Sequence, residues 1–175
     1  NYYEEQRYTK QALEDVQHAL RQDADDILAL SMEARLLRRL GNYEESFAVL
    51  EQLKTLNPNN NTVLLRQVSL LEKQKRSDEA LSLIENSIEG NADPAALYLG
   101  AGRLHYELAQ YDWALAKCRA ALSVQPENGY AYRGIGLTEQ ALKNNSAAVE
   151  AFENYLRLVP DAPDRASIRG WMRKQ

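Results

Sequence analysis

The side chains that most often carry catalytic or metal chemistry are sparse in this chain of 175 residues. Cys118 is the one cysteine, and the two histidines, His18 and His105, are far apart in sequence. A zinc site needs a cluster of such ligands, and a disulfide needs a second cysteine. The sequence therefore predicts no metal site, no cofactor and no internal disulfide. It offers no catalytic group and does not predict an enzyme.

Two short Gly-x-Gly patterns, at 100–102 and 134–136, are the nearest approach to a phosphate-binding motif. A phosphate loop follows a strand, whereas these glycines lie in segments of helical composition. We interpret them as sites of close helix packing. His105 and Cys118 occupy positions that normally pack, so a structural role is favoured over a catalytic base or a reactive thiol.

The charge balance limits the class of partner. With 21 basic and 25 acidic residues the net charge is -4, which argues against a general nucleic-acid binder. No run approaches the roughly 18 to 20 apolar residues of a membrane-spanning helix. We therefore expect a soluble chain without membrane insertion, in the cytoplasm or the bacterial periplasm. Because residue 1 is Asn, we also expect a fragment of a larger protein.

The chain repeats with a period of 34 residues. Pro126 and Pro160 are separated by one period, and Pro58 lies two periods before Pro126. One column holds a small side chain in every unit: Ala12, Ser46, Ala80, Ala114 and Ala148. Four residues later a second column is apolar: Val16, Leu50, Ile84, Cys118 and Phe152. Small residues permit close helix approach and large ones fill the gap beside them, so the spacing predicts stacked helices.

This period sets the expected domain boundaries. Four full units are predicted at 27–60, 61–94, 95–128 and 129–162. A partial unit is predicted at 1–26, with residue 1 inside the first helix of a pair. Residues 163–175 space Ile168, Trp171 and Met172 as a helix that caps the last unit. Helix starts are expected at Asp25-Asp26, Asn61-Thr62 and Asp93-Pro94.

A further column identifies the kind of repeat. It reads Ala34, Val68, Gly102 and Gly136, and four residues earlier stand Leu30, Leu64, Tyr98 and Tyr132. With the columns above and the closing proline, this resembles the tetratricopeptide repeat, and 95–128 is the best match. The resemblance implies an all-α fold of tandem helix-turn-helix repeats, stacked as a right-handed α-solenoid. It also implies a scaffold or adaptor that binds a peptide or protein segment in a concave groove.

In that family the first helix of each pair lines the groove. The four first helices sum to +3 here and the four second helices to -6. By analogy, the groove would present Arg35, Arg39, Arg66, Arg103, Tyr106, Tyr130 and Arg133. Arginine offers several donors to carboxylates and tyrosine offers contact area, which favours an acidic peptide as the guest. The alternative is that these arginines pair with Glu72, Glu107 and Glu139.

Two other functions remain open. The chain could be the substrate-binding or dimerisation region of a multidomain enzyme of the transferase or hydroxylase type. It could also form a homodimer through Tyr2, Tyr3 and Tyr8 or through the surface around Trp171. The closing segment from Pro160 resembles that of bacterial repeat proteins, including envelope assembly factors. The Lys, Asn and Arg set with which some members of the family bind chaperone tails has no counterpart here.

Overall fold

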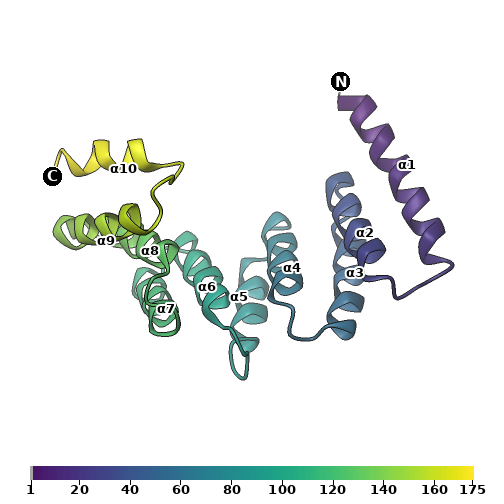
Figure 1. The fold of residues 1–175 in the computed structure, drawn as a ribbon, viewed down its shortest axis with the longest axis horizontal. Helices are drawn as coiled ribbons and strands as arrows, with labels where there is room; N and C mark the ends of the chain where they lie inside the picture. The colour runs from purple at the N-terminus through teal and green to yellow at the C-terminus, as the bar shows by residue number, and fades with distance from the viewer. Residues whose placement is uncertain (1) are drawn as a thin grey trace. The chain divides into compact units, whose positions relative to one another are not determined.

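The computed structural model describes residues 2–175, and of Tyr2 only the backbone. This part of the chain is helical throughout and contains no strand, which confirms the prediction of an all-α chain (Figure 1). The helices are α1 Tyr2–Leu20, α2 Ile27–Leu40, α3 Tyr43–Leu56, α4 Asn61–Lys73, α5 Ser77–Asn86, α6 Ala95–Glu107, α7 Tyr111–Val124, α8 Gly129–Ala141, α9 Asn145–Leu158 and α10 Arg165–Met172.

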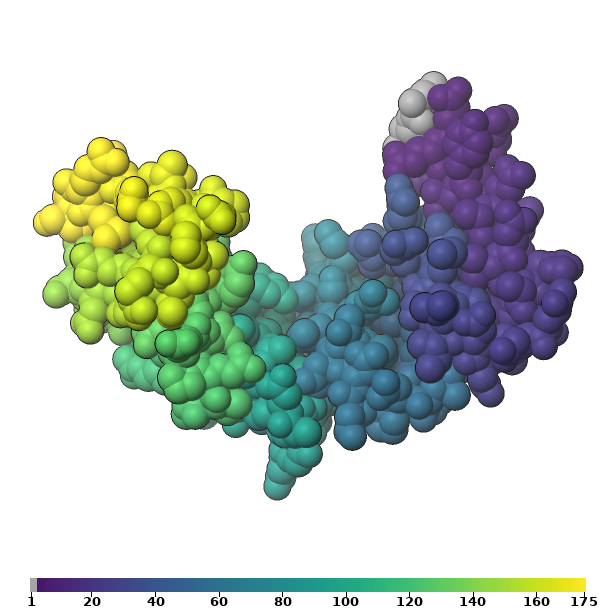
Figure 2. Space-filling model, in the orientation of Figure 1, coloured from purple at the N-terminus to yellow at the C-terminus, as the bar shows by residue number. Residues whose placement is uncertain are grey.

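The chain divides into two compact units, Asn1–Leu83 and Ile84–Gln175, with the boundary inside α5. In the first unit α1 packs on α2, α2 on α3 and α3 on α4. In the second unit α6 packs on α7 and α8, α7 on α8, α8 on α9, and α9 on α10. The space-filling view shows α1 in contact with the α2–α3 pair, and α10 lying on α9 (Figure 2).

A turn of two or three residues joins the helices of each pair. One residue in each of the four turns has a positive φ: Gly41 (86°), Lys75 (60°), Ala109 (56°) and Lys143 (62°). The amide of the residue that follows it donates to a carbonyl five residues back, as in Asn42 to Leu37 (2.9 Å) and Gln110 to His105 (2.8 Å). This is the Schellman arrangement, which satisfies carbonyls at a helix end. Glycine is present in only one of the four turns, so the other three hold a side chain in the left-handed region.

The start of the chain differs from the other pairs. Residue 1 lies outside the described residues, so its expected place in the first helix of a pair is not described. Residues 2–20 form one helix, with no turn at positions 7–9 where a pair would have one. The sequence there is Arg7-Tyr8-Thr9, without glycine or asparagine, and the Thr9 hydroxyl donates to the carbonyl of Glu5 (2.8 Å) within the helix.

Asparagine and aspartate begin several helices, though not always at the expected residue. Asp26 accepts from the amides of Leu28 (2.8 Å) and Ala29 (3.1 Å), as predicted. Asn60 caps α4, so the expectation of Asn61-Thr62 was one residue late. At α6 the cap position is Pro94, one residue after the predicted Asp93, and Pro94 makes no side-chain cap bond. Proline there has no amide proton to satisfy, and its ring fixes φ for the entry into the helix.

Each unit has its own apolar core. The first is built from Leu30, Ala34, Leu50, Leu53, Val63 and Leu70. The second is built from Ala148, Phe152, Tyr155, Leu156, Ala162 and Ile168. In the second unit a Cβ at Gly136 would lie 2.6 Å from the Phe152 ring, and one at Gly134 would lie 2.6 Å from Cys118 Sγ. The glycines thus permit close helix approach, as the sequence indicated.

Polar pairs join the second helix of one repeat to the first helix of the next. The second-helix members are 34 residues apart: Gln17, Glu51, Glu85 and Arg119. Their partners are Glu33 (3.0 Å), Gln67, His105 (3.2 Å) and Glu139 (3.5 Å). The sequence analysis missed this column because its residue types vary, although its period is that of the repeat. The pairs give polar side chains a partner where helices stack, although Oε1 of the buried Gln67 has none among residues 2–175.

Candidate functional site

A pocket of about 380 Å³ lies in the first unit between α2, α3 and α4. Its lining consists of Ala34, Arg35, Arg38, Ser46, Leu50, Arg66, Ser69 and Leu70. The carbon-rich floor comes from the repeat columns, because Leu50 and Ala34 are the apolar and small residues that allow α2 and α3 to pack. The Ser46 hydroxyl is engaged with the Ala34 carbonyl (2.7 Å) and shapes the floor.

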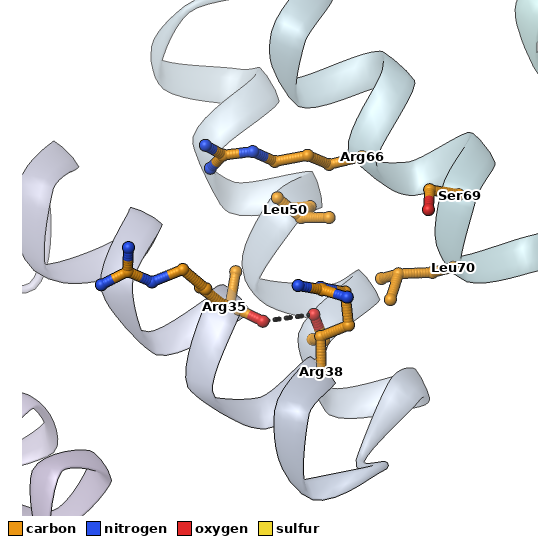
Figure 3. A pocket seen from close by; sticks show the side chains of 8 residues that line it. Arg35, Arg38, Leu50, Arg66, Ser69 and Leu70 are labelled. Carbon is orange, nitrogen blue, oxygen red and sulfur yellow. Dashed lines mark hydrogen bonds between the residues drawn. The ribbon is translucent and has the colours of Figure 1, made fainter. Parts of the chain in front are cut away.

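Three guanidinium groups surround this floor. Arg35 and Arg38 come from α2, and Arg66 comes from α4. Figure 3 shows the guanidinium groups of Arg35 and Arg66 extended toward the same side of the pocket, with that of Arg38 nearer to Leu70. All three side chains are exposed, and none makes an ion pair within residues 2–175. The pocket therefore presents three positive charges without a counter-charge from the described chain.

Arg39, also predicted for the groove, is committed elsewhere. Its Nη2 donates to Oε1 of Glu5 on α1. The pair lies at a second, shallower hollow of about 450 Å³ between α1 and α2, which Tyr8 and Leu36 also line. Arg39 is thus separate from the three arginines of the pocket, although it is on the same helix as two of them.

Arg103 and Tyr106 lie on α6, in the second unit. Nη1 of Arg103 donates to Oε1 of Glu107 one turn later (2.7 Å), which is the pairing that the sequence analysis held as the alternative. The Tyr106 ring packs against Tyr111 at the start of α7, with centroids 5.8 Å apart. Both side chains therefore contact their own unit.

Arg133, on α8, contacts the segment that leads into α10, and Tyr130 of the same helix lies near Tyr155 of α9. Nε of Arg133 donates to Oδ2 of Asp164 (2.6 Å), and the Tyr155 hydroxyl donates to Oδ1 of the same carboxylate (2.8 Å). Tyr130 is exposed and lies 6.2 Å from Tyr155, centroid to centroid. Tyr155 stands where the repeat usually has alanine. Its hydroxyl holds Asp164, which explains the departure.

These contacts shift two pKa values in the second unit. Burial by itself would raise the pKa of Asp164, but the hydrogen bonds from Arg133 and Tyr155 outweigh it, and the pKa is lowered. Burial, followed by the hydrogen bond to Asp164, raises the pKa of Tyr155 to about 12. Asp164 is therefore an ionised acceptor at neutral pH, and Arg133 is already occupied by it.

Of the seven predicted site residues, two lie together in the pocket. Arg35 and Arg66 both line it, whereas Arg39, Arg103, Tyr106, Tyr130 and Arg133 do not. The analysis missed Arg38, which completes the set from the next turn of α2. Its signal was available in the sequence, because residues three apart on a helix share a face and Arg38 follows Arg35 by three.

Two chemically capable side chains of the second unit, His105 and Cys118, are buried. His105 is buried, with Nδ1 2.6 Å from Oε1 of Gln110 and Nε2 3.2 Å from Oε1 of Glu85. Nζ of Lys117 lies 2.7 Å from the same Glu85 oxygen. Burial alone raises the pKa of the Cys118 thiol to about 11, which leaves it protonated at neutral pH.

Residues 2–175 hold no group of three or more His, Cys, Asp or Glu side chains placed to bind a metal ion. Among the same residues no helix has the length and apolar character needed to cross a membrane.

Comparison with known proteins identifies the repeat. Residues 31–96 and 99–163, most of the chain, match the family model described as tetratricopeptide repeat. No curated protein has a matching sequence.

Solved structures share the fold at low identity. PilW, described as a widely conserved type IV pilus biogenesis factor, is 18% identical with a TM-score of 0.75, over 99% of this chain and 80% of that one. A repeat protein from Parabacteroides merdae is 20% identical with a TM-score of 0.72, over 95% and 68%. YrrB, described as a TPR protein with an unusual peptide-binding site, is 18% identical with a TM-score of 0.65, over 97% and 85%.

Proposed function

The chain belongs to the tetratricopeptide repeat family, and on this premise we propose that it is a protein-interaction scaffold. A peptide or protein segment binds in the first unit, at the pocket formed by Arg35, Arg38 and Arg66. The segment is acidic, and the chain itself performs no catalysis.

One observation carries the proposal. Three exposed guanidinium groups converge on an apolar floor, and the described chain gives them no carboxylate. Hydrogen bonds that involve a charged group contribute about 1.5–3 kcal/mol each, and two or three of them supply a useful part of a peptide's affinity. When a guest covers the apolar floor, apolar surface is removed from water, which also favours binding. A carboxylate beside an apolar group fits both features.

The arginines of the second unit supply the contrast. Arg103 and Arg133 already have carboxylate partners at 2.7 and 2.6 Å, so an incoming acidic group would have to displace Glu107 or Asp164. The free positive charge of the first unit is available without that cost. The first unit is therefore the proposed binding region.

The proposal is tested by selecting peptides from a random display library on the wild-type chain and measuring their affinity by fluorescence anisotropy. We expect an Arg35→Glu, Arg66→Glu variant to bind the selected peptides at least tenfold more weakly. The matched control, Arg103→Glu with Arg173→Glu, makes the same change in net charge in the second unit and should bind within twofold of wild type. Circular dichroism verifies that both variants remain helical.

Two results contradict the proposal. One is that no peptide is enriched over a blank surface. The other is that enriched peptides bind both double variants equally well.

A further inference from the structure

Helix α2 exposes large apolar side chains at its beginning. Ile27 is 50% exposed, Leu28 80% and Met32 43%, and all precede the basic end of the same helix. Single exposed apolar residues are ordinary on protein surfaces. Leu28 and Met32 are distinctive because they lie on the same face of α2 as Arg35, which lines the pocket.

Leu28, Met32 and Arg35 are spaced at i, i+4 and i+7, so they form one stripe along α2. Arg35 is in the pocket lining, which places the two apolar residues on the face that continues from the pocket toward the start of α2. The one acidic residue of α2, Glu33, is turned to α1, where its Oε1 accepts from Gln17 (3.0 Å). The α2 stripe, defined as Leu28, Met32 and Arg35, therefore has an apolar first part and a basic second part.

The adjacent first helix, α4, has no matching apolar part. The positions one repeat after the stripe hold Thr62, Arg66 and Ser69, and one turn later stands Lys73. Lys73 is exposed and, within residues 2–175, makes no ion pair. Basic charge is thus gathered at the pocket and on α4, while of these two helices only α2 exposes large apolar side chains.

Resting on the proposed function, we propose that the first unit recognises a partner segment with an apolar group and an acidic group at a fixed spacing. We call this the ordered segment. The segment places an apolar side chain on Leu28 and Met32 and a carboxylate among Arg35, Arg38 and Arg66. A helix rises about 1.5 Å per residue, so the centres of these two groups are about 10 Å apart along α2. An extended chain advances about 3.3 Å per residue, so the apolar and acidic residues of the partner are about three positions apart.

Charge complementarity selects this occupant over others. A purely apolar segment would leave the three guanidinium groups without a counter-charge, and a purely acidic one would leave Leu28 and Met32 in water. A segment with both groups at the stated spacing satisfies both parts of the surface at once.

The test uses four synthetic peptides with blocked ends, so that their terminal charges do not contribute. The first carries two leucines centred three positions from two glutamates in a Gly-Ser background. The second replaces both leucines with serine, and the third replaces both glutamates with glutamine. The fourth has the composition of the first, but its leucines and glutamates are nine positions apart. Dissociation constants are measured by NMR titration of the isotope-labelled full chain.

We expect the first peptide to bind at least fivefold more tightly than each of the other three. In a Leu28→Ser, Met32→Ser variant the first peptide should bind less than twofold more tightly than the second, serine-containing peptide. The affinity of the second peptide should not change. Both residues are exposed, so the fold should persist, and circular dichroism checks this.

The failures of the two proposals are distinguishable. If the first and fourth peptides bind equally, or if the Leu28→Ser, Met32→Ser variant keeps the full preference, the ordered segment is wrong while acidic binding at the pocket stands. If display-selected peptides require Arg35 and Arg66 but the four peptides do not differ, the ordered segment is likewise wrong. If neither selected nor synthetic peptides depend on the arginines, both proposals fail. The inference would also be overturned if the chain dimerises as its concentration rises, measured by sedimentation, and peptide binding is lost in the dimer.

Discussion

Arg35 in the first unit and Arg103 in the second occupy the same position of the repeat, two periods apart, yet they differ in what they can bind. Arg103 has Glu107 one turn later and pairs with it at 2.7 Å. Arg35 has Arg39 at the equivalent place, and Arg39 is itself held by Glu5. The same side chain in the same repeat position is therefore neutralised in one unit and free in the other. Its neighbour four residues on decides the outcome.

The arginines of α4 and α8 also differ in what they contact. In the first unit Arg66 faces the pocket, whereas in the second Arg133 fixes Asp164 and, with Tyr155, the entry to α10. One unit leaves Arg66 without a carboxylate, and the other supplies the carboxylate from its own chain. The contrast between the two units leads to four predictions.

The largest effect is expected for Asp164→Asn, which removes the carboxylate from Arg133 and Tyr155. Loss of two hydrogen bonds to a partly buried charge should lower the free energy of unfolding of the second unit by about 2 kcal/mol. Because both tryptophans, Trp113 and Trp171, lie in that unit, urea denaturation followed by their fluorescence reports it selectively. Asp161→Asn, an exposed aspartate three residues earlier, is the control and should change stability by less than 0.5 kcal/mol, as is usual for surface substitutions.

The same carboxylate gives the second unit a pH dependence. Since the pKa of Asp164 is lowered in the folded chain, its stabilising effect is complete above the pKa of the unfolded chain. The effect is lost as the pH falls through the lower folded value, that is below about pH 4. Wild type and Asp164→Asn should therefore converge in stability at low pH. A constant difference from pH 7 to pH 2 would show that ionisation of Asp164 is not the source.

An exchange of the deciding neighbours tests the contrast directly. Arg39→Glu gives Arg35 the acidic neighbour that Arg103 has, and should weaken binding of display-selected peptides about fivefold, or roughly 1 kcal/mol. Glu107→Arg makes the reverse exchange in the second unit and should leave that affinity within twofold. Anisotropy titrations at 0.05 and 0.5 M salt check both, because screening should shrink the difference at high salt. An unchanged affinity for Arg39→Glu at low salt would show that Arg35 does not contact the guest.

The smallest effect concerns the turns, where the first unit has Gly41 and the second has Ala109 at positive φ. Ala109→Gly should raise the free energy of unfolding by about 0.5–1 kcal/mol, since glycine tolerates this conformation. Gly41→Ala should lower it by a similar amount, through the backbone alone, because no atom lies within 4 Å of the added Cβ. Tryptophan fluorescence follows the first variant and circular dichroism the second. A loss of stability in Ala109→Gly would contradict the assigned strain.

Sequence reasoning recovered the fold well because its signals are local and repeated. The 34-residue columns fix which faces of the helices pack, and the small residues at Gly134 and Gly136 already implied close contacts, now seen against Cys118 and Phe152. Where it erred, the cause was local competition: Asn60 caps α4 in place of Asn61, and Pro94 leaves α6 without the side-chain cap expected from Asp93.

The candidate site was recovered in part. Arg35 and Arg66 were predicted and lie in one pocket, and Arg38 could have been added from its i+3 spacing. The pairing of Arg103 with Glu107 was also legible, because it is a contact within one helix. Arg39 and Arg133 were not separable from the others by spacing, since their partners are 34 and 31 residues away.

The sequence by itself thus determined the repeat, the helical composition and the positions where arginine stands on the first helix of each pair. These depend on periodicity, which is a property of the chain. The tertiary structure alone decided that Arg39 and Arg133 are not free. That outcome depends on whether a carboxylate distant in sequence, such as Glu5 or Asp164, is brought within hydrogen-bonding distance when the helices pack.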